Sequence, residues 1–128
     1  MPGEKLFPKG SPPPIAPYSP GMKAGNTVYV SGAVPMDANG DVVGVGDIAV
    51  QTEKTIQNMS DVLEAGGASL DDVVMVQIFL TDFKNYRPMN EVYGKYFGKN
   101  PPARFCVKCE LVMPEFLVEI AAIAVIGG

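Results

Sequence analysis

The stretch VVMVQIFLTD at positions 73–82 constrains the fold more than any other part of the chain, because it is apolar almost throughout. A strand with one side in water alternates apolar and polar residues, whereas a strand covered on both faces is apolar along most of its length. We therefore predict that this stretch is a central strand of a sheet, covered on both faces.

Segments 47–65 and 85–97 place apolar residues at the spacing of an amphipathic helix. Gly66 and Gly67 supply a stop at the C-terminal end of the first segment. Pro88 falls in the first turn of the second, where a missing N–H costs no hydrogen bond. The chain is therefore expected to combine a sheet with two helices.

Other strands are predicted before and after these helices. The sequence GNTVYVSGAVP at 25–35 alternates in the manner of a strand, and the pair Asn39-Gly40 that follows is typical of the tip of a β-hairpin. Two closing strands are predicted at 104–111 and 117–126, where β-branched and apolar residues predominate.

The expected fold class is α/β (α+β), with the element order β-β-α-β-α-β-β in a single domain over residues 1–128. Seven of the twelve prolines lie in the first 20 residues, so segment 1–14 is expected to be irregular. Two helices cover only one face of a mixed sheet. An apolar second face would be exposed in a single chain, and this predicts an oligomer.

Composition excludes several classes of protein. With 47% hydrophobic and 19% charged residues, the 128-residue chain is globular rather than wholly disordered. No apolar run reaches the roughly 18 residues of a membrane span, and the start MPGEKLFPKGSPPP has no apolar signal region. We expect a soluble, cytoplasmic protein with no membrane partner. A net charge of −4 and scattered basic residues disfavour nucleic-acid binding.

Histidine is absent from the sequence. This absence excludes Ser-His-Asp and Cys-His catalysis, histidine metal sites and the commonest general base at neutral pH. Any chemistry must then use carboxylates, arginine, lysine, tyrosine, cysteine, backbone groups or a bound water.

Charged residues interrupt both closing strands, with Arg104 in the first and Glu119 in the second. An unpaired charge is costly to bury, so each residue is expected to have an oppositely charged or hydrogen-bonding partner. Strand alternation places Arg104 and Cys106 on one face, where they can line a pocket that Glu119 reaches if the two strands are neighbours. The alternative is an Arg104–Glu119 salt bridge that only fixes the strand register.

Three further motifs each allow more than one interpretation. Gly32 in VSGAVP marks either a simple β-bulge or a backbone N–H that binds a ligand carboxylate. Tyr18, between prolines in IAPYSPG, either donates to a ligand or fills a gap in the core. Cys106 and Cys109 form a C-x-x-C typical of redox dithiols or half of a zinc site. A strand sends these two side chains to opposite faces, so we expect neither a redox nor a metal role.

Together, IAPYSPG, VYVSGAVPMDANGDVV, YRPMNEVYGKYF and PARFCVKCELVMPEFLVEIAAIAV resemble the RidA (YjgF-type) family of enamine/imine deaminases over nearly the whole chain. The form PARFC, with Phe105, is similar to the RutC branch, which is associated with aminoacrylate. Phe105 departs from the small residue of the central RidA branch. The resemblance implies a chorismate-mutase-like fold and a homotrimer with three clefts between subunits.

The resemblance also implies roles for individual residues. Arg104 matches the arginine that grips a substrate carboxylate, and Glu119 matches the acid that holds the attacking water. The residues that match the lining of the cleft are Tyr18, Gly32, Asn90 and Cys106. The implied reaction is hydrolysis of a carboxylate-bearing enamine or imine of the 2-aminoacrylate, 3-aminoacrylate or 2-aminomuconate type, with no metal or organic cofactor. The products are ammonia and an oxo acid.

Two other functions stay open. The same cleft can serve a non-catalytic module that senses 2-oxo acids, because Arg104 and Gly32 alone suffice for binding. Ribonuclease activity has been attributed to relatives of this family, although the acidic composition and the missing histidine disfavour it.

Overall fold

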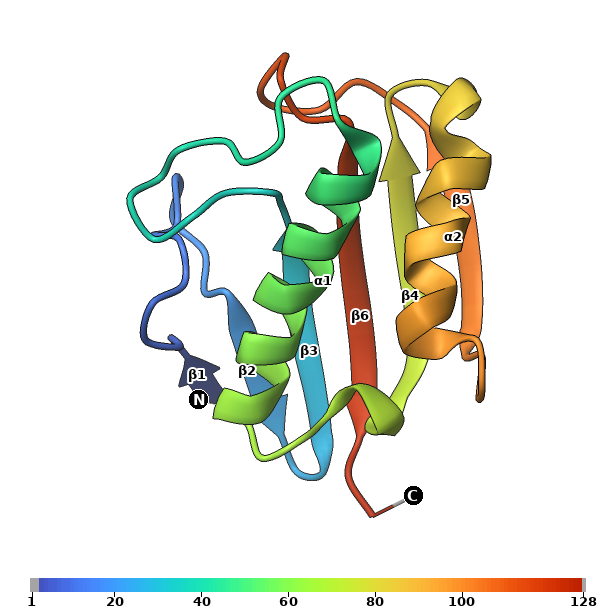
Figure 1. Ribbon diagram of the computed structural model, residues 1–128. Coiled ribbons are helices and arrows are strands. Elements are labelled where there is room, and N and C mark those ends of the chain that lie inside the picture. The colour runs from blue at the N-terminus through green and yellow to red at the C-terminus, as the bar shows by residue number, and fades with distance from the viewer. Residues whose placement is uncertain (1–2, 128) are drawn as a thin grey trace.

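The fold is described by a computed structural model, which covers residues 3–127. It is a mixed sheet of six strands in the order β1-β2-β3-β6-β4-β5, with both helices on the same face (Figure 1). The strands are β1 (Glu4–Leu6), β2 (Gly21–Ala24), β3 (Thr27–Ala33), β4 (Val73–Leu80), β5 (Ala103–Lys108) and β6 (Val118–Val125). The helices are α1 (Ile48–Ala65) and α2 (Tyr86–Phe97), with short 3-10 turns at Leu70–Asp72 and Phe83–Asn85. The predicted fold class, with two helices on one face of a mixed sheet, is confirmed.

β4 lies inside the sheet, antiparallel to β6 on one side and parallel to β5 on the other. The prediction of a central strand is confirmed, and so is the expectation that the second face of the sheet is exposed in a single chain. Its cover by another copy stays a prediction. Val76 and Ile78 on the helix side are fully buried, whereas Val74 is 48% exposed. Both helices pack on the same face, so the apolar residues on the other side have no cover.

The helices begin and end where the sequence predicts. Asp47 caps α1 by accepting a hydrogen bond from the backbone N–H of Val50 at 3.1 Å. The helix ends at Gly66, and the φ of +82° at Gly67 turns the chain away. Pro88 lies in the first turn of α2, as expected. Asn85 precedes α2, but its side chain forms no capping hydrogen bond with the helix.

The predicted hairpin-type turn with Asn39-Gly40 at its tip is confirmed, because an antiparallel bridge between Met36 and Val42 closes it. The chain then passes through Gly44 and Gly46, whose φ angles are positive, and forms no further strand before α1. The strand that pairs with β3 is β2, which precedes it in the sequence. The two are joined at Gly25, whose φ of +58° suits a tight turn.

The N-terminal segment is less irregular than predicted. Its residues Glu4–Leu6 form β1, which pairs with β2 at the edge of the sheet. No proline lies between Pro2 and Pro8, so residues 4–6 keep their backbone N–H groups. Leu6 is 3% exposed and anchors this edge in the core.

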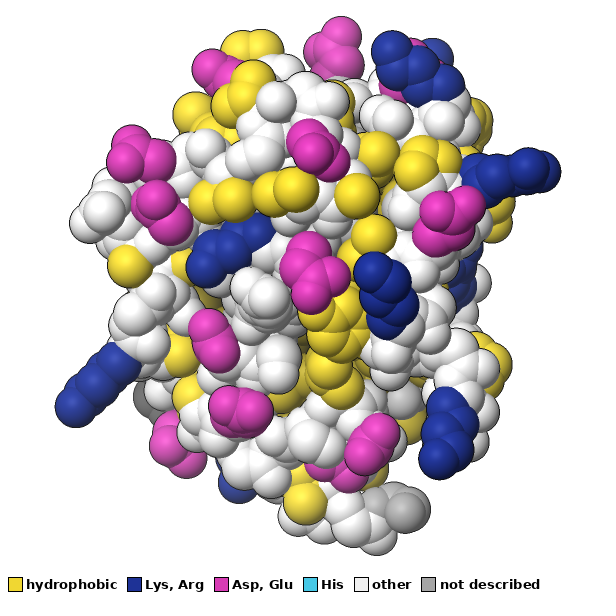
Figure 2. Space-filling view, in the orientation of Figure 1, with side chains coloured by type: hydrophobic (Ala, Val, Ile, Leu, Met, Phe, Trp, Pro, Cys, Tyr) yellow, Lys and Arg dark blue, Asp and Glu magenta, His cyan; other side chains and the backbone are white. Residues whose placement is uncertain are grey.

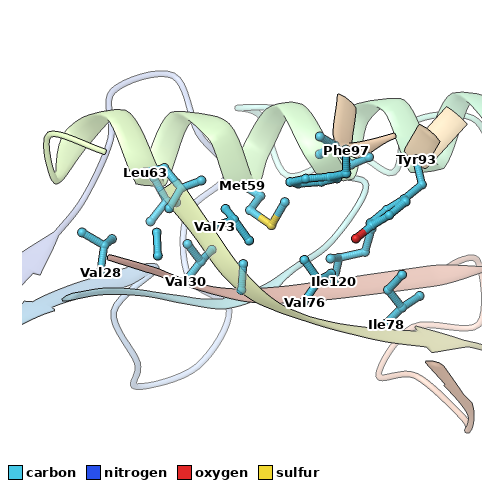
Figure 3. Close-up of a cluster of buried hydrophobic side chains, with 14 of the residues drawn as sticks. Val28, Val30, Met59, Leu63, Val73, Val76, Ile78, Tyr93, Phe97 and Ile120 are labelled. Carbon is cyan, nitrogen blue, oxygen red and sulfur yellow. The ribbon is translucent and has the colours of Figure 1, made fainter. Parts of the chain in front are cut away.

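The hydrophobic core lies between the sheet and the two helices. Side chains of the helices point toward those of the strands in Figure 3, with Met59 and Leu63 from α1 and Tyr93 and Phe97 from α2. β6 shows the alternation most clearly, because every second residue is buried in this core. These core residues of β6 are Val118, Ile120, Ala122 and Ala124.

One polar residue, Gln51, is completely buried in α1 and joins the helix to two loops. Its amide nitrogen donates to the carbonyls of Gly44 and Glu115, at 3.2 and 2.8 Å. Its amide oxygen accepts from the backbone N–H of Leu117 at 2.8 Å. The side chain therefore fixes the segment that leads into β6.

Replacing Gln51 with leucine is expected to lower the free energy of unfolding by about 2–4 kcal/mol, because buried backbone groups lose their partners. Urea unfolding followed by circular dichroism measures the change. The same substitution at the exposed Gln57 of α1 is the control, and its stability should match that of the parent. Equal stability of the two variants would contradict the structural role of Gln51.

The face of the sheet opposite the helices, named the open face, carries mainly apolar side chains. It includes the exposed residues Tyr29, Val74, Phe105 and Val107. Phe79 and Phe105 pack edge to face on it, with ring centroids 6.4 Å apart. Figure 2 shows the other side of the molecule, over the helices, where acidic and basic side chains are interspersed. Within residues 3–127, neither helix has the length and apolar character needed to cross a membrane.

Candidate functional site

Arg104 lies on β5 and points toward α2. Its Nη2 atom donates to the Asn90 side-chain oxygen at 2.7 Å and to the Tyr86 hydroxyl at 3.1 Å. The guanidinium carbon lies 4.7 Å from the ring centroid of Tyr93 and 5.7 Å from that of Tyr86. Aromatic faces and neutral oxygens therefore orient the charge without cancelling it.

The guanidinium borders a concavity of about 530 Å³ at the surface. Phe83, Tyr86, Phe105 and Cys106 line it together with Arg104. Arg104 forms no ion pair, since the only one within 4.0 Å among residues 3–127 joins Lys84 and Asp82. An arginine held in this way can receive an anion.

Glu119 lies on the open face of β6, next to Gly32 of β3. A Cβ added to Gly32 would overlap the Glu119 carboxylate and come within 2.8 Å of its carboxyl carbon. Burial raises the pKa of Glu119 above its usual value. The structure therefore places an acid of raised pKa against bare backbone, which suits proton transfer.

Gly32 and Tyr18 line one cavity of about 50 Å³ beneath the proline-rich segment. The β3–β6 register shifts between Val30 and Ala33, so the predicted bulge at Gly32 is confirmed. A ligand bond from its N–H stays a prediction. Tyr18 is 43% exposed, so the interpretation that it fills a core gap is wrong.

The predicted site residues fall into two separate groups. Arg104, Asn90 and Cys106 form one, named the arginine half-site. Glu119 and Gly32 form the other, named the glutamate half-site, and Tyr18 is connected to it only through the cavity that it lines with Gly32.

The two half-sites do not meet within one chain. β4 lies between β5 and β6, so the condition under which Glu119 would reach the pocket of Arg104 within one chain, that the two closing strands are neighbours, is not met. The register aligns Arg104 with Val76 on the helix side and Glu119 with Phe79 on the open face. The alternative of an Arg104–Glu119 salt bridge is therefore wrong.

Cys106 and Cys109 are both free thiols. Cys106 packs against the core beside Arg104, whereas Cys109 follows the end of β5 and lines a different concavity with Met113. Burial raises the pKa of Cys106, and the nearby guanidinium partly opposes this effect. A raised pKa keeps the thiol protonated and weakly nucleophilic.

Tyr86 and Tyr93 contact Arg104 but were not among the site residues predicted from the sequence. Tyr93 is 6% exposed, and burial raises the pKa of its hydroxyl, with the guanidinium acting in the opposite direction. The positions 86, 90 and 93 follow the i, i+4, i+7 spacing that puts three residues on one helix face. This spacing was the signal that would have found them.

A family model described as endoribonuclease L-PSP matches residues 9–126 of the chain. The chain belongs to this family, which includes the RidA (YjgF-type) proteins. The resemblance noted in the sequence is thereby confirmed.

Individual relatives of this family match almost end to end. A protein of Acinetobacter baylyi named 3-aminoacrylate deaminase RutC is 49% identical over 124 residues, covering 97% of this chain and 98% of the relative. A crystal structure of a Thermotoga maritima protein superposes with a TM-score of 0.91 at 40% identity and covers 98% of both chains. The structure of Escherichia coli TdcF with bound serine gives a TM-score of 0.88 at 28% identity, covering 95% of this chain and 98% of TdcF.

Proposed function

We propose that the protein is a hydrolytic deaminase of small enamines or imines that carry a carboxylate, and that it needs no cofactor. The observation that carries this proposal is the guanidinium of Arg104, which faces a concavity without a protein anion. The 49% identity with a protein named 3-aminoacrylate deaminase supports the substrate class. The TdcF structure with bound serine supports recognition of a small amino-acid-like carboxylate.

The catalytic cleft in this proposal forms between two copies of the chain in a homotrimer. A neighbour that covers the apolar open face can bring its glutamate half-site to the arginine half-site of the first copy. Two facts support this arrangement: the half-sites lie on opposite faces of one sheet, and the open face exposes Tyr29, Val74 and Phe105. The predicted site residues then serve one cleft although they come from two chains.

The proposed reaction uses the two charged residues in different steps. Arg104 holds the carboxylate, and the enamine tautomerises to the imine by gaining a proton on carbon and losing one from nitrogen. Glu119 holds a water and takes its proton as the water oxygen attacks the imine carbon. Return of that proton to nitrogen gives a neutral tetrahedral adduct with one hydroxyl and one amino group. Transfer of the hydroxyl proton to nitrogen then lets the C–N bond break, which releases ammonia and leaves an oxo acid. A raised pKa suits Glu119 to both transfers, because the proton is then neither lost nor held too firmly.

Replacing Glu119 with glutamine tests this function. The variant keeps the shape of the side chain but cannot take a proton, so ammonia release from enzymatically generated aminoacrylate should fall by about 10²- to 10⁴-fold. Binding of pyruvate, measured by calorimetry, should stay within about twofold of the parent. A parent protein that binds pyruvate but releases no ammonia above the uncatalysed rate would instead support the sensing module.

The same variant has a second readout in stability. Burial raises the pKa of Glu119 in the folded chain, so the folded protein holds this proton more tightly than the unfolded chain does. The stability that this proton confers is present at low pH and is lost as the pH rises through the raised pKa. Glutamine does not ionise, so the variant should gain stability relative to the parent as the pH rises.

Endoribonuclease activity is the second candidate, because the family description names it. The net charge of −4 and the interspersed charges over the helices weigh against a phosphate-binding surface (Figure 2). A fluorescent RNA cleavage assay separates the two functions. Cleavage by the parent that is lost in the Glu119→Gln variant would favour the nuclease.

A further inference from the structure

The two hydrogen bonds of Arg104 both leave from Nη2. This atom carries two N–H groups, and it donates to two acceptors, Asn90 Oδ1 at 2.7 Å and the Tyr86 hydroxyl at 3.1 Å. Nη2 is therefore fully used before any ligand arrives.

A guanidinium can present two parallel N–H bonds to a carboxylate in two ways, through Nη1 with Nη2 or through Nε with Nη2. Both pairs include Nη2. A two-point contact with a ligand carboxylate therefore requires that one of the two existing bonds opens.

The bond to Tyr86 is the one placed to open. It is the longer of the two and lies in an exposed position, whereas the bond to Asn90 is short and partly buried. Tyr86 also borders the concavity of about 530 Å³, next to Phe83 and Arg104. A carboxylate entering this concavity would replace the neutral hydroxyl acceptor with a charged acceptor, and a bond between two charged groups is stronger.

We propose that the Tyr86 hydroxyl is a built-in competitor for the ligand carboxylate, occupying the position of one ligand oxygen on Arg104 and leaving it when the ligand binds. This inference rests on the proposed carboxylate-binding role of Arg104. Without a ligand, the Tyr86 hydroxyl accepts a hydrogen bond from an N–H of Arg104 that would otherwise have no acceptor in the protein. Tyr86 thereby sets how tightly the site holds a carboxylate.

The test is the Tyr86→Phe variant, with pyruvate as the carboxylate probe and calorimetry as the measurement. Phenylalanine keeps the ring that packs edge to face on Phe83, with centroids 6.5 Å apart in the parent, and removes only the hydroxyl. The dissociation constant for pyruvate should fall by about 2- to 10-fold, the worth of one neutral hydrogen bond. The KM for the enamine should fall by the same factor with kcat unchanged.

Tyr96→Phe is the matched control. It is the same chemical change on the same helix, but the Tyr96 hydroxyl bonds to Glu53 of α1 rather than to Arg104. This variant should bind pyruvate as the parent does. An equal increase in pyruvate affinity in both variants would overturn the proposal, because the effect would then not depend on the bond to Arg104.

Unchanged or weaker pyruvate binding in Tyr86→Phe would also overturn the proposal, since the hydroxyl would then be irrelevant or a ligand contact. The binding readout separates this proposal from the deaminase function. If Tyr86→Phe binds pyruvate more tightly than the parent but the parent releases no ammonia, the competing role of Tyr86 is supported and the deaminase function is refuted. If the parent deaminates the substrate but Tyr86→Phe binds pyruvate as the parent does, only the proposal that Tyr86 competes for Arg104 is refuted.

Discussion

Replacing Arg104 with alanine is expected to lower kcat/KM for aminoacrylate deamination by about 10²- to 10⁴-fold. The variant loses one or two charge-assisted hydrogen bonds to the substrate carboxylate, each worth about 1.5–3 kcal/mol. Ammonia release, coupled to a dehydrogenase that consumes it, measures the rate. A rate equal to that of the parent would remove the basis of the proposed function.

Arg104→Lys is the conservative control for this experiment. Lysine keeps the positive charge but lacks the planar fork and cannot stack on Tyr93 in the same way. Its kcat/KM should therefore lie between those of alanine and arginine. Full activity with lysine would show that charge alone suffices.

Mixing two inactive variants tests whether the cleft is shared between chains. When equal amounts of Arg104→Ala and Glu119→Gln subunits assemble at random into trimers, each half-site of a cleft is intact in half of the cases. About one quarter of the clefts then combine two intact half-sites, so about a quarter of the parent activity should return. Co-refolded mixtures that stay inactive would show that no such sharing occurs.

Replacing Gly32 with alanine is the second change with a large expected effect. The new methyl group would overlap the Glu119 carboxylate, whose carboxyl carbon lies 2.8 Å from the ideal Cβ position. The carboxylate must move, so activity should fall by about 10²-fold or more, as expected when a reacting group is displaced by an ångström. The free energy of unfolding should fall by about 1–3 kcal/mol.

Two variants make this result specific. Gly94→Ala adds the same methyl group to α2, where nothing lies within 4 Å of the new atom, and should raise stability by about 0.5–1 kcal/mol. Adding Glu119→Asp to Gly32→Ala shortens the crowded side chain and should restore most of the lost stability. A stable and active Gly32→Ala variant would contradict the close contact.

The sequence predicted those elements whose signals are local. The apolar run of β4 and the periodicity of α1 and α2 depend on residues within each segment, and the caps at Asp47 and Gly66 act within one turn. The turn at Asn39-Gly40 was predicted for the same reason, because its signal lies within a few residues. That β3 pairs with β2, which precedes it, depends on residues outside the turn.

The arrangement of the candidate site could not be predicted in the same way. Residue types and their match to the RidA family indicated Arg104, Glu119 and four further residues as candidates for the site. The alternation rule places each side chain on a face of its own strand only. Which strand lies between β5 and β6, and which face the helices cover, depend on pairing across the chain. Tyr93 was not predicted as a site residue because it was assigned to the buried stripe of the helix, and Tyr86 was given no role.

The separation of Arg104 and Glu119 by the thickness of the sheet has a consequence for the newly synthesised polypeptide. Under the proposed function, a lone subunit carries both chemical groups yet is inert, and turnover begins only with assembly. Specific activity should therefore decline on dilution below the dissociation constant of the complex. A defective subunit incorporated into a mixed complex would impair the clefts that it shares with its neighbours as well.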